Sequence, residues 1–428
     1  MAFSPVQKLM VRRRTLDGQL VDVGVLAQNR QGVFFQYRES YLSTYGNLSP
    51  FTLKADLTVQ AAPKTPHLGL NGVFADALPD GWGLLLQDRV FRQHGILLND
   101  ITQMDRLAFV GNAALGALSF SPISEHSTIQ TDSVSLNELG INAQQIYDGQ
   151  TEDVLSALVA GGSSGGARPK AQIYFNGDNF NSCRTFEKSG DDAWIVKFTS
   201  KNLSLGHEEG QCEAVYLTLA KELGLNPPKW KLLNASERSG TKKWLAIKRF
   251  DFRKNSEGKS GRFHMHSACG LLDADFRSPS LDYDDLIKAS SVLCKSPALG
   301  QIQFRRAMFN LVFLNQDDHS KNWAFLQDDE GQWQPAPFYD VTYSSHPFGG
   351  QATSFSGFAK MPPTKALQKL AQSASYRNWQ SAKEVIEETV DKVTDFERVA
   401  IDLGVSPTTI SLIKQRLEIS KKAVLETV

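Results

Sequence analysis

The sequence predicts an α+β fold in which a small β-rich unit comes first and a larger unit follows, whose strands give way to helices. Residues 19–26 alternate apolar and polar side chains, and residues 33–37 combine β-branched and aromatic ones, as β-strands do. Further short apolar segments between residues 171 and 251 are typical of strands. Beyond Tyr283 the apolar spacing becomes mostly helical, so we expect the last third of the chain to be a helical lobe.

Composition narrows the class of protein. The 428 residues suffice for two or three domain-sized units with a substantial core. The 46 basic and 46 acidic residues cancel, so neither broad nucleic-acid binding nor an acidic tail is expected. No apolar run is long enough to span a membrane, and residues 1–5 lack a signal-peptide core. The four scattered cysteines form no C-x-x-C pair, which predicts reduced thiols in a cytoplasmic protein.

The first predicted domain covers residues 1–125 and is rich in strands. Within it, Pro79-Asp80 is typical of the start of a helix, which would carry the apolar residues between Leu84 and Phe91. The segment 121–150 is rich in Ser, Thr, Gln and Asn, so we expect a connection between domains at 126–153.

The second predicted domain part covers residues 154–280 and opens on a glycine-rich run at 161–170. Four positions of that run lack side chains, so its backbone N–H groups can close around phosphate oxygens, and Lys170 adds a positive charge. The run is neither a Walker A motif nor a G-x-G-x-x-G motif, and a flexible surface loop is the alternative. A strand predicted at 171–175 follows directly.

A lysine and a glutamate then occur at positions that kinases use for nucleotide phosphates. Lys197 lies near the end of the strand predicted at 193–198, and Glu213 is expected to head the helix at 213–223. A strand lysine paired with a helix glutamate holds the α- and β-phosphates in kinases. The alternatives are a solvated strand end for Lys197 and a surface helix position for Glu213.

The last predicted part, residues 281–428, contains the most informative motif. An apolar helix at 305–314 delivers a polar loop in which Asp317 can accept a proton from a hydroxyl. Asn322 and Asp340 can hold Mg²⁺ against nucleotide phosphates, because Mg²⁺ prefers oxygen ligands. The order matches a catalytic-loop Asp and Asn followed by a metal-binding Asp in protein kinases, although the letters are not H-R-D and D-F-G.

Two other features carry weaker signals. His319 is expected either to contact substrate or to orient the loop by hydrogen bonding, and no second His or Cys lies at the spacing of a zinc site. Residues 396–413 have a helix-turn-helix pattern in which Pro407 could begin a recognition helix. An ordinary helical hairpin is the alternative, and the neutral net charge favours it.

Five ordered motifs together resemble the HipA family of serine/threonine kinases, the toxin halves of HipA–HipB toxin–antitoxin modules. The motifs are Gly166–Lys170, Ile195–Lys197, Lys248–Asp251, Asp317–Asn322 and Tyr339–Val341. The resemblance covers nearly the whole chain. It implies a HipA-like, protein-kinase-related fold, with a small β-rich N-terminal domain and a kinase-like domain whose C-terminal lobe is mainly helical.

The resemblance also implies roles for individual residues. Asp317 would be the catalytic base, supported by His319 and Lys197, and Asn322 and Asp340 would be the Mg²⁺ ligands. The expected ATP contacts are Gly165, Gly166, Lys170, Lys197, Glu213, Lys248, Phe250 and Tyr339. Of these, Lys248 and Phe250 would offer backbone groups to the adenine.

Regulation is implied by position as well. The family's autophosphorylated serine corresponds to Ser163, and Ser164 is adjacent, so either or both could be modified. A phosphoserine there would repel the nucleotide phosphates and switch the kinase off. One departure stands out, because His264-Met265-His266-Ser267 replaces a segment in which family members often carry a Glu-Asp pair.

We therefore expect a cytoplasmic, ATP- and Mg²⁺-dependent serine/threonine kinase that inhibits growth as a toxin. Its expected partners are a HipB-like helix-turn-helix antitoxin, DNA only through that antitoxin, and a protein substrate, which in some family members is an aminoacyl-tRNA synthetase. One alternative is a nucleotide-binding pseudokinase that acts as a transcriptional co-regulator with the antitoxin. Another is a small-molecule phosphotransferase, against which the N-terminal domain argues.

Overall fold

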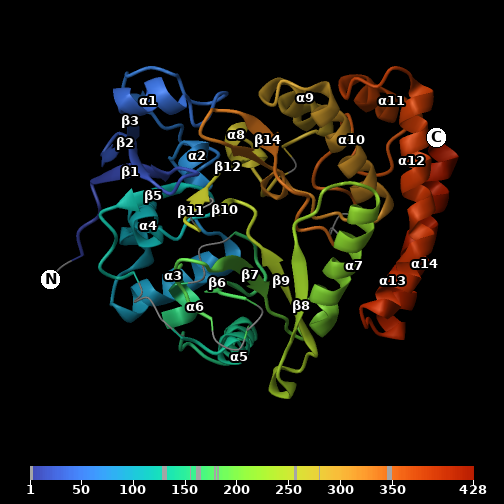
Figure 1. Ribbon diagram of the computed structural model, residues 1–428, viewed down its shortest axis with the longest axis horizontal. Coiled ribbons are helices and arrows are strands. Elements are labelled where there is room, and N and C mark those ends of the chain that lie inside the picture. Colours follow the sequence, from blue (N-terminus) through green and yellow to red (C-terminus); the bar gives the residue numbers. More distant parts are fainter. Residues whose placement is uncertain are drawn as a thin grey trace. The chain divides into compact units, whose positions relative to one another are not determined.

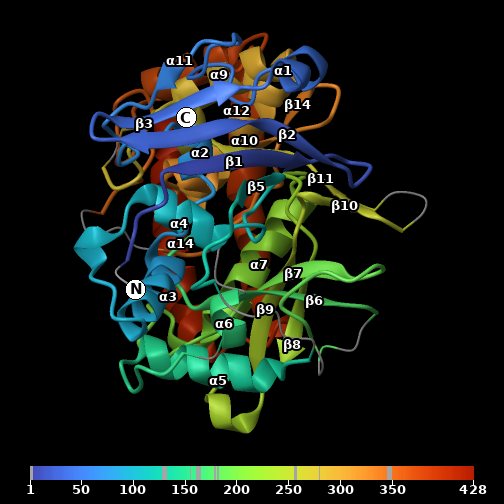
Figure 2. The ribbon, with the colours of Figure 1, turned by 90° about the vertical axis from the view of Figure 1, so that its left-hand side faces the viewer.

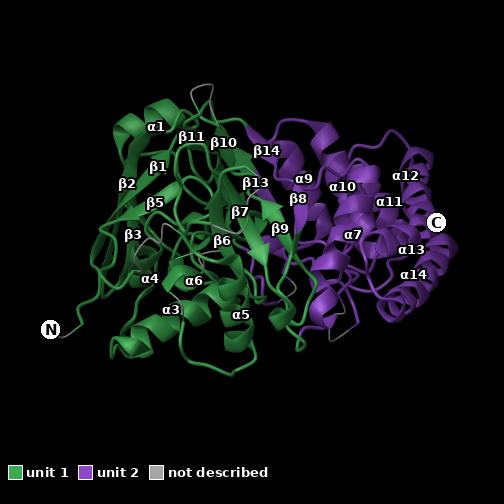
Figure 3. Ribbon diagram, turned by 60° about the horizontal axis from the view of Figure 1, so that its bottom comes forward, with its two compact units in different colours: residues 1–202, 233–273, 326–332 green, residues 203–232, 274–325, 333–428 purple. Residues whose placement is uncertain are grey.

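The structure is a computed structural model. It describes residues 3–127, 133–154, 156–160, 165–177, 180, 183–254, 258–278, 280–344 and 349–428. Contacts within the chain divide it into two compact units (Figure 3). Unit 1 comprises residues 1–202, 233–273 and 326–332, and unit 2 comprises residues 203–232, 274–325 and 333–428. The four-part division expected from the sequence stays a prediction.

Unit 1 contains most of the strands (Figure 1). Its strands are β1 (Lys8–Arg14), β2 (Leu20–Asn29), β3 (Gly32–Tyr37), β4 (Gln60–Ala61), β5 (Leu118–Ser121), β6 (Lys170–Phe175), β7 (Asp192–Lys197), β9 (Lys243–Lys248), β10 (Phe252–Lys254), β11 (Ser260–Arg262) and β12 (His264–Ser267). Its helices are α1 (Glu39–Tyr45), α2 (Gly72–Ala75), α3 (Gly81–Gln93), η1 (Leu98–Asp100), α4 (Gln103–Val110), α5 (Leu136–Tyr147), α6 (Ser156–Ala160), η3 (Glu237–Ser239) and α8 (Ala268–Leu271).

Unit 2 is mainly helical, as the sequence beyond Tyr283 predicts (Figure 1). Its elements are η2 (Gly206–Glu208), α7 (Glu209–Glu222), α9 (Tyr283–Leu293), α10 (Pro297–Val312), η4 (Ser320–Asn322), β14 (Trp333–Pro335), α11 (Thr364–Ser373), α12 (Trp379–Asp391), η5 (Lys392–Asp395), α13 (Phe396–Asp402) and α14 (Pro407–Thr427). Strands β8 (Trp230–Asn234) and β13 (Ala324–Gln327) each contain one of the points where the chain passes between units. Among the described residues, no helix is long and apolar enough to cross a membrane.

An antiparallel sheet forms the N-terminal part of unit 1, and its strand order is β4-β3-β2-β1-β5. Figure 2 shows β3, β2 and β1 side by side. Alternate residues of β1 are buried, as a strand with one face on a core requires. Leu9 and Val11 of β1 pack with Phe35 of β3 and Phe74 of α2 in one hydrophobic cluster. Strands β2 and β3 of this sheet confirm the two strands predicted at 19–26 and 33–37.

The second sheet of unit 1 has the order β6-β7-β9-β8, and a second cluster packs on it. The helix predicted from Pro79-Asp80 is α3, and it contributes to this cluster. The segment 121–150, expected to be a connection, contains the helix α5, which the sequence analysis did not predict. Its polar composition conceals a buried stripe that includes Leu139 and Ala143 at helical spacing. Gly140 lies on that stripe, and a Cβ there would overlap with the Trp244 ring.

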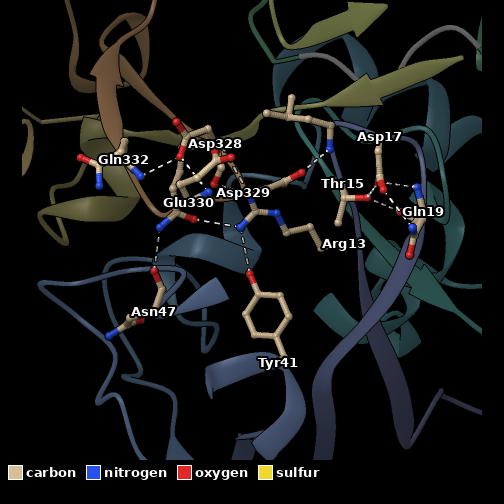
Figure 4. Close-up of polar contacts among 12 residues, drawn as sticks. Arg13, Thr15, Asp17, Gln19, Tyr41, Asn47, Asp328, Asp329, Glu330 and Gln332 are labelled. Carbon is tan, nitrogen blue, oxygen red and sulfur yellow. Dashed lines mark hydrogen bonds and ion pairs between the residues drawn. The ribbon is translucent and has the colours of Figure 1, made fainter. Parts of the chain in front are cut away.

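A buried arginine fastens the N-terminal sheet to the turn after β13 (Figure 4). The Arg13 side chain of β1 is fully buried, and its guanidinium donates to the Tyr41 hydroxyl at 3.1 Å and to Gln327 Oε1 at 3.0 Å. It also forms an ion pair with Asp329 at 3.2 Å, and Asp329 accepts a hydrogen bond from the Leu16 N–H at 2.7 Å. Residues far apart in the sequence are therefore joined inside unit 1.

Helix α10 is central to unit 2, where it packs against α9, α11, α12 and α14. The C-terminal elements α13 and α14 form a helical hairpin rather than a free DNA-reading module. One face of α14, including Ile413 and Leu417, is buried against the rest of the unit. The turn between α13 and α14 is tied to α7, because Gln211 Nε2 donates to the Gly404 carbonyl at 2.7 Å. This arrangement supports the hairpin alternative.

Candidate active site

The catalytic loop predicted from the sequence begins where α10 ends. Leu314 takes a left-handed backbone with φ of 54°, which ends the helix sharply. Asn315 then anchors the loop back on the helix, because its N–H donates to the Asn310 carbonyl at 3.0 Å and its Nδ2 to Asn310 Oδ1 at 2.9 Å. The loop leads into η4 at Ser320.

Three of the predicted site residues lie together in this loop. The Asp317 side chain is 66% exposed, so its carboxylate can meet a substrate. Asn322 Nδ2 donates to the Asp317 carbonyl at 2.7 Å, and His319 Nε2 lies 3.9 Å from Asp317 Oδ1. The Asp317 N–H donates to Ser344 Oγ at 3.0 Å, which fixes the backbone that carries the carboxylate.

The second predicted metal ligand is attached to the same loop by its neighbour. The Tyr339 hydroxyl donates to the Lys321 carbonyl at 2.7 Å, and Lys321 directly precedes Asn322. Asp340 has φ of 58°, a left-handed conformation that Asp tolerates better than most residues and that functional sites often keep. Tyr339 and Asp340 are thus brought to the catalytic loop within unit 2.

The donor atoms fit Mg²⁺ better than a transition metal. Because the Asn322 amide nitrogen is used on Asp317, its oxygen is left as a ligand, and Asp340 supplies a carboxylate. Mg²⁺ is usually held by one or two such oxygens together with substrate phosphates. Among the described residues, no group of three His, Cys, Asp or Glu side chains could form an all-protein metal cage. The metal role of both residues stays a prediction.

The nucleotide residues predicted earlier in the chain belong mostly to unit 1. Lys170 on β6 lies opposite Lys197 on β7 in the antiparallel register. Glu213 belongs to unit 2 and does not head its helix, because α7 begins at Glu209 and Glu213 lies in its second turn. The expected ion pair between Lys197 and Glu213 stays a prediction. Ser163 and Ser164 lie outside the described residues.

Hydrogen bonds join the end of the glycine-rich run to the start of α3. The Gly166 N–H donates to the Asp80 carboxylate, and the Trp82 N–H donates to the Gly166 carbonyl at 3.0 Å. The Trp82 indole N–H donates to the Lys170 carbonyl at 2.9 Å. Gly166 has φ of 95°, which favours glycine. Sequence reasoning took Asp80 only as the start of a helix and missed this contact, although the Asp-Gly-Trp motif was visible.

The Lys170 side chain is also engaged in the loop. It is buried, and its ammonium donates to the Gly165 carbonyl. Gly165 lies close to Asp80 as well, since a Cβ there would approach Asp80 Oδ1 to 3.2 Å. In this conformation the Gly166 N–H and the Lys170 ammonium are therefore hydrogen-bonded within the protein itself.

The charged side chains of the motif Lys248–Asp251 form two separate sets of contacts. Lys248 Nζ binds Asp192 Oδ2 at 2.8 Å on one side. On the other, the buried Arg249 donates to Asp251 Oδ1 at 3.0 Å, and Asp251 Oδ2 accepts the Gly116 N–H at 2.8 Å. Burial would raise the pKa of Asp251, but the Arg249 charge holds it below its ordinary value. Arg249 and Asp251 thus connect the end of β9 to Gly116 in the N-terminal part of unit 1.

The departure at 264–267 has a structural explanation. His264 Nε2 lies 2.9 Å from the Leu48 carbonyl, His266 Nε2 lies 2.8 Å from Ser49 Oγ, and His266 Nδ1 lies 2.6 Å from Asp76 Oδ2. Ser49, His266 and Asp76 have the connectivity of a hydrolase triad, but Ser49 and His266 are fully buried. No substrate can reach that hydroxyl, so we interpret the cluster as an internal fastening of unit 1.

This cluster predicts loss of stability in mild acid. Burial lowers the pKa of His264 well below its ordinary value, so its contribution to stability is present above about pH 6.5 and is lost as the pH falls and the unfolded chain binds a proton. We expect the stability advantage of wild type over His264→Gln to shrink by up to about 1.4 kcal/mol per pH unit below pH 6.5. Thermal unfolding between neutral pH and mild acid measures this, with the exposed His94→Gln as control. An advantage that stays constant across that range would contradict the assignment.

Two family models match the chain. One, described as the HipA-like C-terminal domain, matches residues 162–396, which is more than half of the chain. The other, described as the HipA N-terminal domain, matches residues 17–121. The two matches fall on the kinase-like and β-rich parts that the sequence predicts.

Curated relatives and a solved structure extend this finding. The serine/threonine-protein kinase toxin HipA of Shewanella oneidensis is 28% identical over 198 residues, and the match spans 42% of this chain and 42% of that relative. A relative from Sinorhizobium fredii, whose name describes a kinase, is 29% identical over 137 residues, 30% of this chain and 31% of its own. The solved complex of HipA, HipB and operator DNA from Shewanella oneidensis has a TM-score of 0.69 and 18% identity over 97% of both chains. That likeness concerns the fold alone.

Proposed function

The chain belongs to the HipA family of serine/threonine-kinase toxins, and from this premise we propose that it is itself an ATP- and Mg²⁺-dependent serine/threonine protein kinase. The observation that carries the proposal is the hydrogen bond from Asn322 Nδ2 to the Asp317 carbonyl at 2.7 Å. It holds a candidate base and a candidate metal ligand in one short loop, to which Tyr339 attaches Asp340. Phosphoryl transfer depends on this kind of positioning rather than on covalent catalysis.

Each residue has a definite task in the proposed reaction. Asp317 accepts the proton of the attacking serine or threonine hydroxyl, and His319 helps to orient the loop. Asn322 and Asp340 would hold Mg²⁺, which supplies neutralising charge to the nucleotide phosphates when bound. Lys197 and Lys170 would add positive charge for those phosphates. Gly165, Gly166, Glu213, Lys248, Phe250 and Tyr339 keep their predicted places as ATP contacts.

The biological role follows from the family. We propose that the kinase acts in the cytoplasm as a growth-inhibiting toxin and that a HipB-like antitoxin binds it. Membership of the HipA family supports such a partner, since a solved structure of the same fold comes from a complex of HipA, HipB and operator DNA, and DNA would be contacted only through it. The substrate would be a protein, with an aminoacyl-tRNA synthetase as one candidate class. Autophosphorylation at Ser163 or Ser164 would switch the kinase off.

Incubation of the purified full-length protein with γ-labelled ATP tests the function. We expect Mg²⁺-dependent incorporation of phosphate into the protein, lost on adding a chelator, and mass spectrometry should place it on Ser163 or Ser164. Binding of Mg²⁺·ATP without any transfer would favour the pseudokinase alternative. Transfer to an amino sugar but not to protein would favour a small-molecule phosphotransferase.

The contact between Asp80 and Gly166 predicts the behaviour of the nucleotide loop. The Asp80 carboxylate uses an N–H that a phosphate would need, and its negative charge would repel that phosphate. A hydrogen bond to a charged acceptor contributes about 1 kcal/mol more than one to a neutral acceptor. We therefore expect Asp80→Asn to bind Mg²⁺·ATP about fivefold more tightly in calorimetric titration. The exposed Asp100→Asn controls for the change of charge, and weaker binding by the Asp80 variant would mean that the carboxylate supports the nucleotide loop instead.

A further inference from the structure

Two consecutive aspartates of the catalytic loop have opposite environments. The Asp317 side chain is 66% exposed, whereas Asp318 is 1% exposed. The proposed reaction uses only the exposed carboxylate. A buried carboxylate beside a catalytic base calls for an explanation, because burying a charge costs free energy unless partners compensate.

The partners of Asp318 are hydrogen-bond donors. Its Oδ1 accepts the Ala352 N–H at 2.8 Å and the Thr353 N–H at 3.1 Å, and its Oδ2 accepts the Tyr283 hydroxyl. The Tyr283 oxygen in turn accepts from Asn310 Nδ2 at 2.9 Å. This pattern matches an ionised carboxylate, since a carboxylic acid would bring a further hydrogen to a site already supplied with donors.

The same hydrogen bonds join parts of unit 2 that are distant in the sequence. Tyr283 begins α9, Asn310 lies on α10, and residues 352–353 follow the predicted metal ligand. The Asp318 backbone takes part as well, because its carbonyl accepts from the Thr353 hydroxyl and from the Trp323 indole N–H at 3.2 Å. Asp318 is therefore the point at which the catalytic loop is attached to α9 and to residues 352–353.

A cavity of about 290 Å³ beside Asp317 gives this fastening a consequence for the substrate. Asp317, His319 and Ser320 form one wall, residues 275–278 and 280–281 form another, and Ala352 contributes as well. Since Asp318 binds the Ala352 N–H, it connects two parts of the cavity lining. Because the candidate base lines this cavity and its volume is at the small end for ligand sites, it suits a single hydroxyl-bearing side chain.

We infer that Asp318 is a positioning residue, whose carboxylate locks the catalytic loop onto residues 352–353 and so fixes both Asp317 and the acceptor cavity. The inference rests on the proposed kinase function and adds to it a residue that does not touch the reacting atoms. Displacement of a base by about 1 Å can cost about 10²-fold in rate. The hydrogen bonds of Asp318 to residues 352–353 therefore affect the rate although Asp318 does not touch the reacting atoms.

The hydrogen bonds that the Asp318 carboxylate accepts depend on pH, because they are strongest when it is ionised. Burial raises the pKa of Asp318 to about 7, although hydrogen bonds from Tyr283, Thr353 and Ala352 act to lower it. Its titratable partner Tyr283 also lies in the field of Asp282, and Asp317 and His319 flank Asp318 in the loop. Because its pKa is raised, Asp318 is protonated at lower pH, and the donors then lose their charged acceptor. The locked loop is thus the form present above about pH 7.

The test compares full-length wild type with Asp318→Asn, which is neutral at every pH. Incorporation of phosphate from γ-labelled ATP into the protein is measured between about pH 6 and about pH 8. An acid with a pKa of about 7 is roughly 9% ionised at the lower limit and roughly 91% at the upper one. We therefore expect the ratio of the wild-type rate to the variant rate to rise about tenfold across this range. Taking the ratio removes the titration of ATP and of every other group.

Two further variants distinguish a positioning role of Asp318 from a role in the stability of the fold alone. Tyr283→Phe removes a donor that lowers the pKa of Asp318, so the acid loss of rate should move to higher pH. This arm decides the matter if Asp318→Asn does not fold. The exposed Asp402→Asn should give a ratio that does not change with pH.

The outcomes are distinct. An active wild type whose rate ratio to Asp318→Asn is constant with pH would overturn the inference and leave the kinase standing. If Asp318→Asn is unfolded, an unmoved acid limb in Tyr283→Phe would overturn it equally. Wild type that transfers no phosphate at any pH would overturn the proposed function and the inference with it.

Discussion

Replacing Asp317 by Asn is expected to lower the rate of phosphoryl transfer by about 10²–10⁴-fold, because a well-placed general base contributes about that much. Asn has nearly the same shape, and the Asp317 side chain is 66% exposed, so the fold should change little. The backbone contacts to Ser344 and Asn322 do not involve the carboxylate and should persist. Initial rates of phosphate incorporation measure the effect, and thermal unfolding verifies the fold.

The matched control is Asp402→Asn, which removes an equally exposed carboxylate from α13. It should transfer phosphate at the wild-type rate. If the Asp317 variant did the same, another group would have to be the base. A loss of activity accompanied by a large fall in melting temperature would instead assign Asp317 a structural role.

Asp251→Ala is expected to lower the free energy of unfolding by about 3–5 kcal/mol, because it leaves the buried Arg249 without its counter-charge. The two side chains are 1% and 3% exposed, so water cannot replace the lost partner. The substitution also removes the acceptor of the Gly116 N–H, which joins this motif to the N-terminal part of unit 1. Chemical denaturation followed by circular dichroism gives the measurement.

Asp192→Ala provides the comparison, since Asp192 pairs with Lys248 and Lys254 at 2.8 and 2.9 Å on a partly exposed surface. A pair of that kind contributes about 0–1 kcal/mol. The double variant Arg249→Met, Asp251→Leu should recover much of the lost stability, because it removes both charges at once. Equal losses in Asp251→Ala and Asp192→Ala would show that burial does not govern the Arg249–Asp251 pair.

Local patterns in the sequence predicted much of the fold. The strand at 19–26 was predicted from the alternation of apolar and polar residues, and the strand at 33–37 from its β-branched and aromatic residues, and both signals lie in consecutive residues. The helix α5 was missed because only its buried stripe is apolar, while the segment as a whole is polar. The start of α7 was placed four residues late, at Glu213, because the first turn lacks the apolar spacing used to find helices.

Some contacts of the candidate site could likewise be predicted from the sequence, and others could not. Asp317 and Asn322 are five residues apart, so their proximity in one loop could be read from spacing, and the structure places them in contact. Asp80 could not be connected with Gly166 from sequence, because 86 residues separate them. The anchoring role of Asp318 was also invisible, since an Asp-Asp pair does not reveal which member is buried.

The sequence by itself determined the family of this protein and predicted the chemistry proposed here, because the Asp–Asn–Asp order and the glycine-rich run are short motifs of the chain. Tertiary structure alone decided which charged groups are exposed for reaction and which are buried for support. Asp317 and Asp318 are the same residue type at adjacent positions, yet one meets solvent and the other meets Tyr283, Ala352 and Thr353. The physical reason is that burial and hydrogen-bond partners come from segments about 30 residues or more away along the chain, and those partners set the charge state and the role of a carboxylate.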